Sequence, residues 1–404
     1  MAAPGRRWLR LQPTALVAAA RRRAGWREFG APDVHGPLCR LIESIEDEAQ
    51  LNVLGRIAAR EDLGRMLVNR LELDRDYQQH PEIAAEQIRR PLFITGLPRS
   101  GSTLLHSLLA QDPANRVPLN WETMYPSPPP EGATHATDPR ADQAERQIRW
   151  FGWLQPEFCR IHPVAARQAE ECVVILSHSF LSYQFSSMYF VPSYQAWMEQ
   201  QDLRPAYECH RRFLQHLQWR CPGDRWVLKA PPHFPTLDAL LAVYPDADVI
   251  VTHRDPLEVA ASVANLHAVL RGTFSDAVQP RKVGPEVSQM LATDIARGMA
   301  ALEAGCARPG QVLDIWYGDL VSNPLAAVRK IYRHFGLPLT AEAEARMRRF
   351  PREALQPEGR HEYSLEAFGL NAEGERRRYR AYRERYGFAG PHTTTERLRT
   401  SGIS

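Results

Sequence analysis

The chain has 404 residues, enough for one large domain that carries an additional subdomain and buries a sizeable core. Its composition, 44% hydrophobic and 24% charged, is typical of a folded globular protein and excludes a disordered or fibrous class. The 50 basic and 47 acidic side chains leave a formal charge of +3, so composition gives no indication of a nucleic-acid partner.

Residues 1–36 form a basic N-terminal extension, with seven arginines among the first 27 positions and no acidic side chain before Glu28. Mitochondrial transit peptides share this pattern; a frayed extension is the alternative, favoured by the arginine- and alanine-rich composition of the whole chain. No apolar run approaches the roughly 20 residues that span a bilayer, so no transmembrane segment is expected. Six scattered cysteines without a C-x-x-C pair indicate a reducing compartment and no structural metal. We therefore expect a soluble, cytoplasmic protein.

Hydrophobic periodicity divides the rest of the chain. Apolar side chains recur at steps of three and four in residues 37–90, which predicts a helical subdomain. Residues 91–388 contain short apolar runs, each followed by a helical stretch, at 92–94, 226–228, 249–251 and 312–315. Such runs are typical of buried parallel strands, so the predicted class is α/β, a parallel sheet flanked by helices with a largely helical insertion at about 115–222. Residues 389–404 are expected to form a flexible tail.

The first of these runs leads into a loop that is suited to an anion. Gly96 and Gly101 allow the backbone to turn closely, and the next helix is expected to begin at Ser102 or Thr103. The free N–H groups and the positive dipole end of that helix would face a phosphate, as in a P-loop-type fold. The predicted phosphate-binding residues are Pro98, Arg99, Ser100, Gly101, Ser102 and Thr103.

The loop departs from the G-x-x-x-x-G-K-[ST] pattern at one position, where Ser102 replaces the lysine. Enzymes that hydrolyse ATP or GTP use that lysine on the β- and γ-phosphates, so its absence argues against this class. The cation is instead Arg99, whose planar guanidinium suits a tetrahedral oxyanion. A glycine-rich turn without a ligand would explain the glycines but not the strand, loop and helix around them.

A second anion motif follows the run at 249–251. Arg254 stands at the end of this predicted strand, and Ser262 lies near the start of the next helix. Both can converge on a further phosphate at the edge of the sheet that carries the first loop. By itself this motif is weak, because an Arg-Asp pair at a strand end is often a surface ion pair.

Together the two motifs resemble those of a known family. The P-R-S-G-S-T sequence at Pro98 to Thr103 and the R-D-P…S sequence at Arg254 to Ser262 are similar to the 5′-phosphosulfate loop and the 3′-phosphate site of sulfotransferases. The resemblance is to bacterial-type members related to tyrosylprotein sulfotransferases, and it covers residues 40 to 388 approximately, including L-K-x-P-x-H at Leu228 to His233. It implies transfer of a sulfuryl group from 3′-phosphoadenosine 5′-phosphosulfate (PAPS) to a hydroxyl or amine, with 3′,5′-diphosphoadenosine as product and no metal requirement.

The resemblance also implies roles for individual residues. Arg99 would contact the 5′-phosphosulfate, and Arg254 with Ser262 would bind the 3′-phosphate. Lys229 would add a second positive charge at the transferred group; a solvent-exposed lysine at a strand end is the alternative. Arg360 and His361 in the C-terminal part would approach the 3′ side of the nucleotide.

Two residues compete for the role of general base, which removes the proton of the acceptor. Glu122 lies about where the tyrosylprotein enzymes carry their catalytic glutamate, although the connecting loop is slightly longer here. His233 resembles the histidine in the K-x-H-x-P sequence of cytosolic enzymes, with extra residues between. Glu122 is favoured, and the choice stays open.

The acceptor site is expected in the insertion, because the nucleotide occupies the sheet edge. Aromatic side chains between Phe180 and Trp197 would suit a small or lipophilic acceptor, although such residues more often belong to a core. Two other classes remain open: a P-loop kinase, with Asp314 or Asp319 holding magnesium, and a non-catalytic module that binds anionic partners. A homodimer is one candidate for the oligomeric state.

Overall fold

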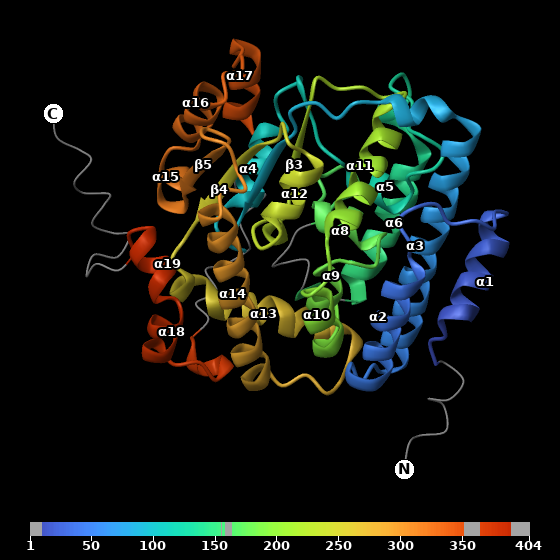
Figure 1. Cartoon of the computed structure of the whole chain (residues 1–404), viewed down its shortest axis with the longest axis horizontal. Coiled ribbons are helices and arrows are strands. Elements are labelled where there is room, and N and C mark those ends of the chain that lie inside the picture. Colours follow the sequence, from blue (N-terminus) through green and yellow to red (C-terminus); the bar gives the residue numbers. More distant parts are fainter. Residues whose placement is uncertain (1–9, 155, 158–163, 351–363, 389–404) are drawn as a thin grey trace.

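The computed structural model describes residues 10–154, 156–157, 164–350 and 364–388. In these ranges a five-stranded sheet has the order β2-β3-β1-β4-β5, and every neighbouring pair is parallel. Figure 1 shows helices on both sides of this sheet. The strands are β1 (Leu92–Gly96), β2 (Asn115–Arg116), β3 (Arg225–Lys229), β4 (Asp248–His253) and β5 (Val312–Trp316). The predicted α/β class and the four predicted strands are confirmed. The sequence does not indicate β2, because two half-buried residues carry no apolar run.

Helices surround this sheet, and their positions set the environment of the strand ends. The α-helices are α1 (Pro13–Ala24), α2 (His35–Glu48), α3 (Val53–Gln79), α4 (Ser102–Leu109), α5 (Asn120–Met124), α6 (Pro139–Leu154), α8 (Cys172–Ser177), α9 (Gln184–Met188), α10 (Pro192–Met198), α11 (Arg204–Gln218), α12 (Leu237–Val243), α13 (Pro256–Phe274), α14 (Pro280–Glu303), α15 (Tyr317–Ser322), α16 (Pro324–His334), α17 (Ala341–Arg349), α18 (Ala372–Arg378) and α19 (Arg380–Arg385). Short 3-10 helices are η2 (Pro81–Ala85), η3 (His135–Thr137), η4 (Pro231–His233) and η6 (Glu366–Phe368).

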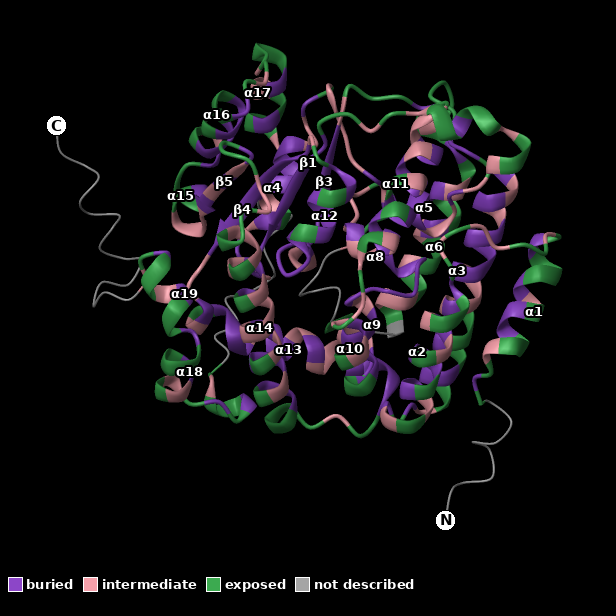
Figure 2. Ribbon diagram, in the orientation of Figure 1, coloured by how far each residue is buried: buried purple, intermediate pink, exposed green. Residues whose placement is uncertain are grey.

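The two faces of the sheet pack against different helices, because side chains alternate along each buried strand. Leu92 and Ile94 of β1 belong to an apolar cluster with side chains of α4 and α16. Phe93, between them, belongs to a second cluster with side chains of α11 and α12. Every residue of β1 and β4 is buried, as the purple ribbon at the centre of Figure 2 shows. The central strands therefore hold the loops at their carboxyl ends in fixed positions.

The N-terminal helices and the insertion share one hydrophobic core. Leu16 of α1, Met66 of α3, Tyr194 of α10 and Phe93 of β1 all belong to the same buried cluster. The expectation of a frayed N-terminal extension is therefore wrong for residues 13–24. These residues form helix α1, and its buried side chains belong to this cluster. None of the helices within the described ranges is long and apolar enough to cross a membrane.

The start of α3 packs closely on the end of α13. The Asn52 amide donates a hydrogen bond of 2.9 Å to the Phe274 carbonyl oxygen. A Cβ atom on Gly55 would lie 2.1 Å from the same oxygen, whereas one on Gly64, later in α3, would meet no heavy atom within 4 Å outside its own helix.

These two glycines give a matched test of the packing. We expect Gly55→Ala to lower the free energy of unfolding by about 1–3 kcal/mol, because the new methyl group overlaps the backbone of α13. Gly64→Ala should raise it by up to about 1 kcal/mol, because alanine is the better helix former. Urea denaturation followed by circular dichroism measures both values, and a stabilising Gly55→Ala would contradict the close contact.

Candidate active site

The loop between β1 and α4 has an unusual backbone. Gly96 has a φ of 121° and Gly101 a φ of 87°, both in the region that favours glycine. A Cβ atom on Gly96 would lie 2.2 Å from the Thr252 carbonyl oxygen, so glycine also permits the close contact of β1 with β4. Arg99, at the tip of the loop, has a φ of 64°, a strained conformation for a non-glycine residue. Such strain is concentrated at functional sites.

The predicted anion-binding residues of this loop divide into two groups. One residue, Ser100, is fully buried: its hydroxyl donates to the Leu97 carbonyl and lies 2.6 Å from Thr252 Oγ1. It holds the loop against β4. The others line a cavity of 1020 Å³, and they are Pro98, Arg99, Gly101, Ser102 and Thr103.

The cavity extends away from the loop into a space between α9, α13 and α14, called here the helical chamber. Its apolar lining residues are Met188 of α9, Val263, Leu266, Leu270 and Phe274 of α13, and Met290, Leu291 and Ile295 of α14. Of the aromatic residues from Phe180 to Trp197, Tyr183 is in the described lining, whereas Phe180, Phe185, Tyr189 and Tyr194 are buried in the core. The chamber is thus mainly aliphatic.

Arg254 lies at the same end of the sheet as the loop, because β4 pairs directly with β1. Its Nη1 donates a hydrogen bond of 3.0 Å to the Arg99 carbonyl oxygen, and its guanidinium stacks on the Tyr317 ring at 4.1 Å from the centroid. Its Nε donates to Glu258 at 3.1 Å. Because Arg99 and Arg254 both line the cavity, the two predicted anion motifs meet at one site.

Lys229 ends β3, and its side chain is 3% exposed, so the alternative of a solvated strand-end lysine is wrong. Its ammonium group pairs with Glu171 and lies 3.4 Å from Thr103 Oγ1 in the first turn of α4. Burial of such a charge requires a partner of opposite sign. Since Thr103 and Glu171 line the cavity, this ion pair lies at its wall.

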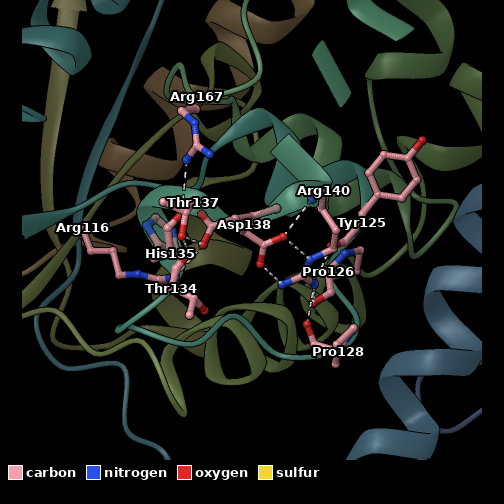
Figure 3. A network of polar contacts seen from close by, with 11 residues as sticks. Arg116, Tyr125, Pro126, Pro128, Thr134, His135, Thr137, Asp138, Arg140 and Arg167 are labelled. Atoms are coloured by element: carbon pink, nitrogen blue, oxygen red, sulfur yellow. Dashed lines mark hydrogen bonds and ion pairs between the residues drawn. The ribbon is translucent and has the colours of Figure 1, made fainter. Parts of the chain in front are cut away.

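Glu122 lies in α5 and is fully buried in a polar network, shown around Arg116 and His135 in Figure 3. Its Oε1 accepts hydrogen bonds from Arg116 at 2.7 Å and from His135 Nε2 at 3.0 Å, and its Oε2 accepts one from the Leu119 amide at 2.9 Å. Burial acts to raise the pKa of Glu122, but the charge of Arg116 and the bond from His135 outweigh it, and the pKa is lowered. Glu122 is not among the described residues that line the cavity.

His233 ends η4, just after β3, and is also fully buried. Its Nδ1 forms a hydrogen bond of 2.7 Å with the Tyr207 hydroxyl, and its ring meets Phe93 edge-on at 5.1 Å between centroids. Burial lowers the pKa of His233 well below its usual value. The neighbours Pro232 and Phe234 line the cavity, whereas His233 is absent from the lining that the described residues form.

The other predicted residues are less closely tied to the cavity. Ser262 lies in the second turn of α13, on the helix that follows Arg254, and is not among the described lining residues. Arg360 and His361, and the predicted tail 389–404, lie outside the described residues. Their roles stay predictions.

Sequence reasoning did not single out Glu171, the carboxylate at the cavity wall. One signal was present: the acidic pair Glu170-Glu171 directly precedes the apolar run that begins at Cys172. Two acids at the edge of a buried helix are unusual, and loss of solvation together with the charge of Glu171 raises the pKa of Glu170 to about 7. Glu170 is not among the described lining residues, so the candidate for function is Glu171, which lies at the cavity wall beside Lys229.

Comparison with known proteins identifies the family of this chain. A model described as sulfotransferase family matches residues 91–341. The chain belongs to the sulfotransferase family. This membership covers the sheet, the loop after β1, Arg254 and most of the helical chamber.

Solved structures of the family are similar over most of the chain. Sulfotransferase STF1 from Mycobacterium tuberculosis H37Rv is 34% identical, with a TM-score of 0.83 over 92% of this chain and 99% of that chain. Sulfotransferase STF9 from Mycobacterium avium is 28% identical, with a TM-score of 0.80 over 92% of this chain and 96% of that chain.

Among curated proteins, the omega-hydroxy-beta-dihydromenaquinone-9 sulfotransferases Stf3 of Mycobacterium bovis and Mycobacterium tuberculosis are each 26% identical over 261 residues. The match spans 61% of this chain and 63% of the length of those relatives. The similarity therefore covers less than two thirds of each relative.

The buried network of Glu122 predicts a pH-dependent stability. Because the pKa of Glu122 is lowered in the folded state, its contribution is present above the unfolded pKa and is lost as the pH falls through the folded value. We expect Glu122→Gln to cost about 3–5 kcal/mol near neutral pH, since Arg116 loses its buried partner. The difference from wild type should shrink on acidification. Urea denaturation across the acidic range tests this, and a constant difference would contradict the ion pair.

Proposed function

We propose that this protein transfers a sulfuryl group from PAPS to a hydroxyl, or an amine, of a small lipophilic acceptor. The observation that carries the proposal is the convergence of Arg99 and Arg254 on one cavity that continues into an apolar chamber. Family membership supports the same reaction. In this proposal PAPS is a co-substrate that supplies the sulfuryl group.

The residues of the cavity fit the anionic ends of such a donor. The backbone around Gly96 and Gly101 leaves no room for Cβ atoms, and the first turn of α4 offers free N–H groups to a phosphate. Arg99 would stabilise negative charge at the phosphosulfate, and Arg254 with Ser262 would bind the 3′-phosphate. Arg360 and His361 are proposed to approach the 3′ side of the nucleotide, as the family resemblance implies.

The general base is proposed to be Glu171 in place of Glu122 or His233. Glu171 pairs with Lys229 and lines the cavity, whereas Glu122 and His233 are fully buried and are not among the described lining residues. Glu171 would accept the proton of the acceptor hydroxyl as the new O–S bond forms and the bond from sulfur to the phosphate oxygen breaks. Lys229 would neutralise charge at the leaving phosphate.

The lining of the helical chamber supports a lipophilic acceptor, because mainly aliphatic side chains cover it. The names of the mycobacterial Stf3 relatives also point to a lipophilic, hydroxyl-bearing acceptor, a quinone derivative. A cytoplasmic location and a homodimer remain predictions.

The arginines give the first test of the donor site. We expect Arg254→Ala to weaken binding of 3′,5′-diphosphoadenosine by roughly 10- to 100-fold, because each charged hydrogen-bonding group contributes about 1.5–3 kcal/mol. Arg99→Ala should reduce turnover with PAPS more than it reduces binding of the diphosphate product, since its contact is with the transferred end. Isothermal titration calorimetry measures the affinity for 3′,5′-diphosphoadenosine. The rate at which this product is released from PAPS measures turnover.

Arg377→Ala, an exposed arginine of α18, is the matched control and should change neither value. Wild-type affinity in Arg254→Ala would contradict the second anion site. Stabilisation of the protein by ATP-Mg alone in a thermal-shift assay would instead favour the kinase class, and diphosphate binding without transfer to any acceptor would favour the non-catalytic module.

The kinetics of single variants separate the three candidates for the general base. Glu171→Gln should lower kcat by roughly 10²- to 10⁴-fold and remove the acidic limb of the pH-rate profile, because an uncharged amide accepts no proton. Glu122→Gln and His233→Phe should act mainly on stability. A pH profile of kcat for the folded variants measures this. If Glu171→Gln retained wild-type kcat while Glu122→Gln or His233→Phe lost it, the base would be reassigned.

A further inference from the structure

The wall of the helical chamber contains polar atoms that the described structure leaves without partners. Asp294 Oδ1, Gln184 Oε1 and His267 Nδ1 are buried and have no hydrogen-bond partner among the described residues. All three residues line the cavity. They come from α14, α9 and α13, so three separate helices bring these atoms into one chamber. An unsatisfied buried polar atom costs roughly 1–3 kcal/mol, so such a group points to a ligand or water that is bound in function.

The burial of these three polar atoms distinguishes them from polar groups on the protein surface. His267 is 5% exposed, and its burial together with the charge of Arg271 lowers its pKa to about 3. The imidazole is therefore neutral, with one nitrogen that can accept and one that can donate. Burial and the charge of Glu199 raise the pKa of Asp294 well above its usual value. Both pKa shifts disfavour the charged forms of His267 and Asp294.

The neighbouring charged groups are already paired with one another. Arg271 Nη1 donates to Glu286 at 2.9 Å, and its Nη2 donates to the Ser186 carbonyl at 2.7 Å. Arg297 lies 3.9 Å from a Glu199 carboxylate oxygen and donates to the carbonyl of the same residue. These pairs leave no excess charge for an ionic ligand, which favours a neutral polar group.

We propose that Asp294, Gln184 and His267 form a second hydrogen-bonding site, which recognises a neutral hydroxyl group carried by the acceptor in addition to the group that is sulfated. The inference deepens the proposed function and rests on it, because the same cavity holds both sites. A hydroxyl both donates and accepts, so it satisfies the amide oxygen of Gln184 together with either the carboxyl or the imidazole. The aliphatic lining between the two sites requires an apolar body. The substrate class is therefore a lipophilic molecule with two hydroxyl groups.

Matched alcohols test this substrate class directly. A series of α,ω-alkanediols and the corresponding 1-alkanols of equal chain length can be titrated against the whole protein without nucleotide. We expect the preferred diol to bind roughly tenfold more tightly than its mono-alcohol, because one buried hydrogen-bonding group discriminates by about this factor. The preferred chain length reports the spacing of the two sites.

Variants of the polar wall supply the controls. Asp294→Leu and Gln184→Leu should each remove the preference for the diol, whereas Asp294→Asn, which keeps hydrogen-bonding atoms, should retain it. Thr293→Val, beside Asp294 but outside the described lining, should leave the preference unchanged. In turnover with PAPS the Asp294→Leu change should raise KM for the diol and leave kcat unaltered, since the group acts in binding alone.

The outcomes separate this proposal from the proposed function. Equal affinity of the wild type for diols and mono-alcohols, including no binding of either, overturns the second site. A preference that survives in both leucine variants overturns it as well, and would mean that water alone occupies these atoms. Failure of 3′,5′-diphosphoadenosine to bind overturns the proposed function, and it is measured separately from the alcohol titrations. If Asp294→Leu does not fold, Gln184→Leu decides the question.

Discussion

Thr252 of β4 holds the loop after β1 in place, and the arrangement of the site depends on this contact. Its hydroxyl donates to the Thr95 carbonyl at 2.9 Å and lies 2.6 Å from Ser100 Oγ. Its carbonyl oxygen lies where a Cβ atom on Gly96 would otherwise stand. With the loop fixed against β4, the Arg99 carbonyl is within reach of Arg254, which follows β4. Arg99 and Arg254, which are distant in sequence, therefore both line one cavity.

The positions of the strand ends also decide which buried charged side chains pair with one another. Lys229 leaves the end of β3, beside β1, and meets Glu171 from the start of α8 and Thr103 from the first turn of α4. Glu171 thus supplies the partner of opposite sign that a buried lysine requires. Glu122 is buried at least as deeply, but its partner is Arg116 of β2, and the ion pair connects α5 to the edge of the sheet. Glu122 thus forms its ion pair in the interior of the protein, whereas Glu171 forms its ion pair at the cavity wall.

The helices that cover the carboxyl ends of the strands make the second part of the cavity, the helical chamber, mainly apolar. Helices α13 and α14 provide aliphatic side chains, and the polar atoms among them come from positions on separate helices. The C-terminal end of the described chain packs on the end of β4, where the Tyr382 hydroxyl is 2.7 Å from His253 Nδ1 and the Tyr386 ring stacks on the same histidine. These contacts hold the end of β4 next to Arg254, and α9, α13 and α14 supply the lining of the helical chamber.

The amino-acid sequence alone determined the class of the fold and the anion motifs. Continuous apolar runs mark the central strands, and the glycine spacing with Arg99 marks the loop, because both signals are local in the chain. Tertiary structure alone decided which polar residues reach the cavity. Glu122 and Glu171 are both glutamates at the start of short helices, and only the packing of those helices separates a carboxylate bound by Arg116 from one at the cavity wall. Likewise, Asp294, Gln184 and His267 belong to three different helices and line one cavity only because the tertiary structure brings α14, α9 and α13 around it. Side-chain environment depends on contacts between distant segments, and no local pattern records those contacts.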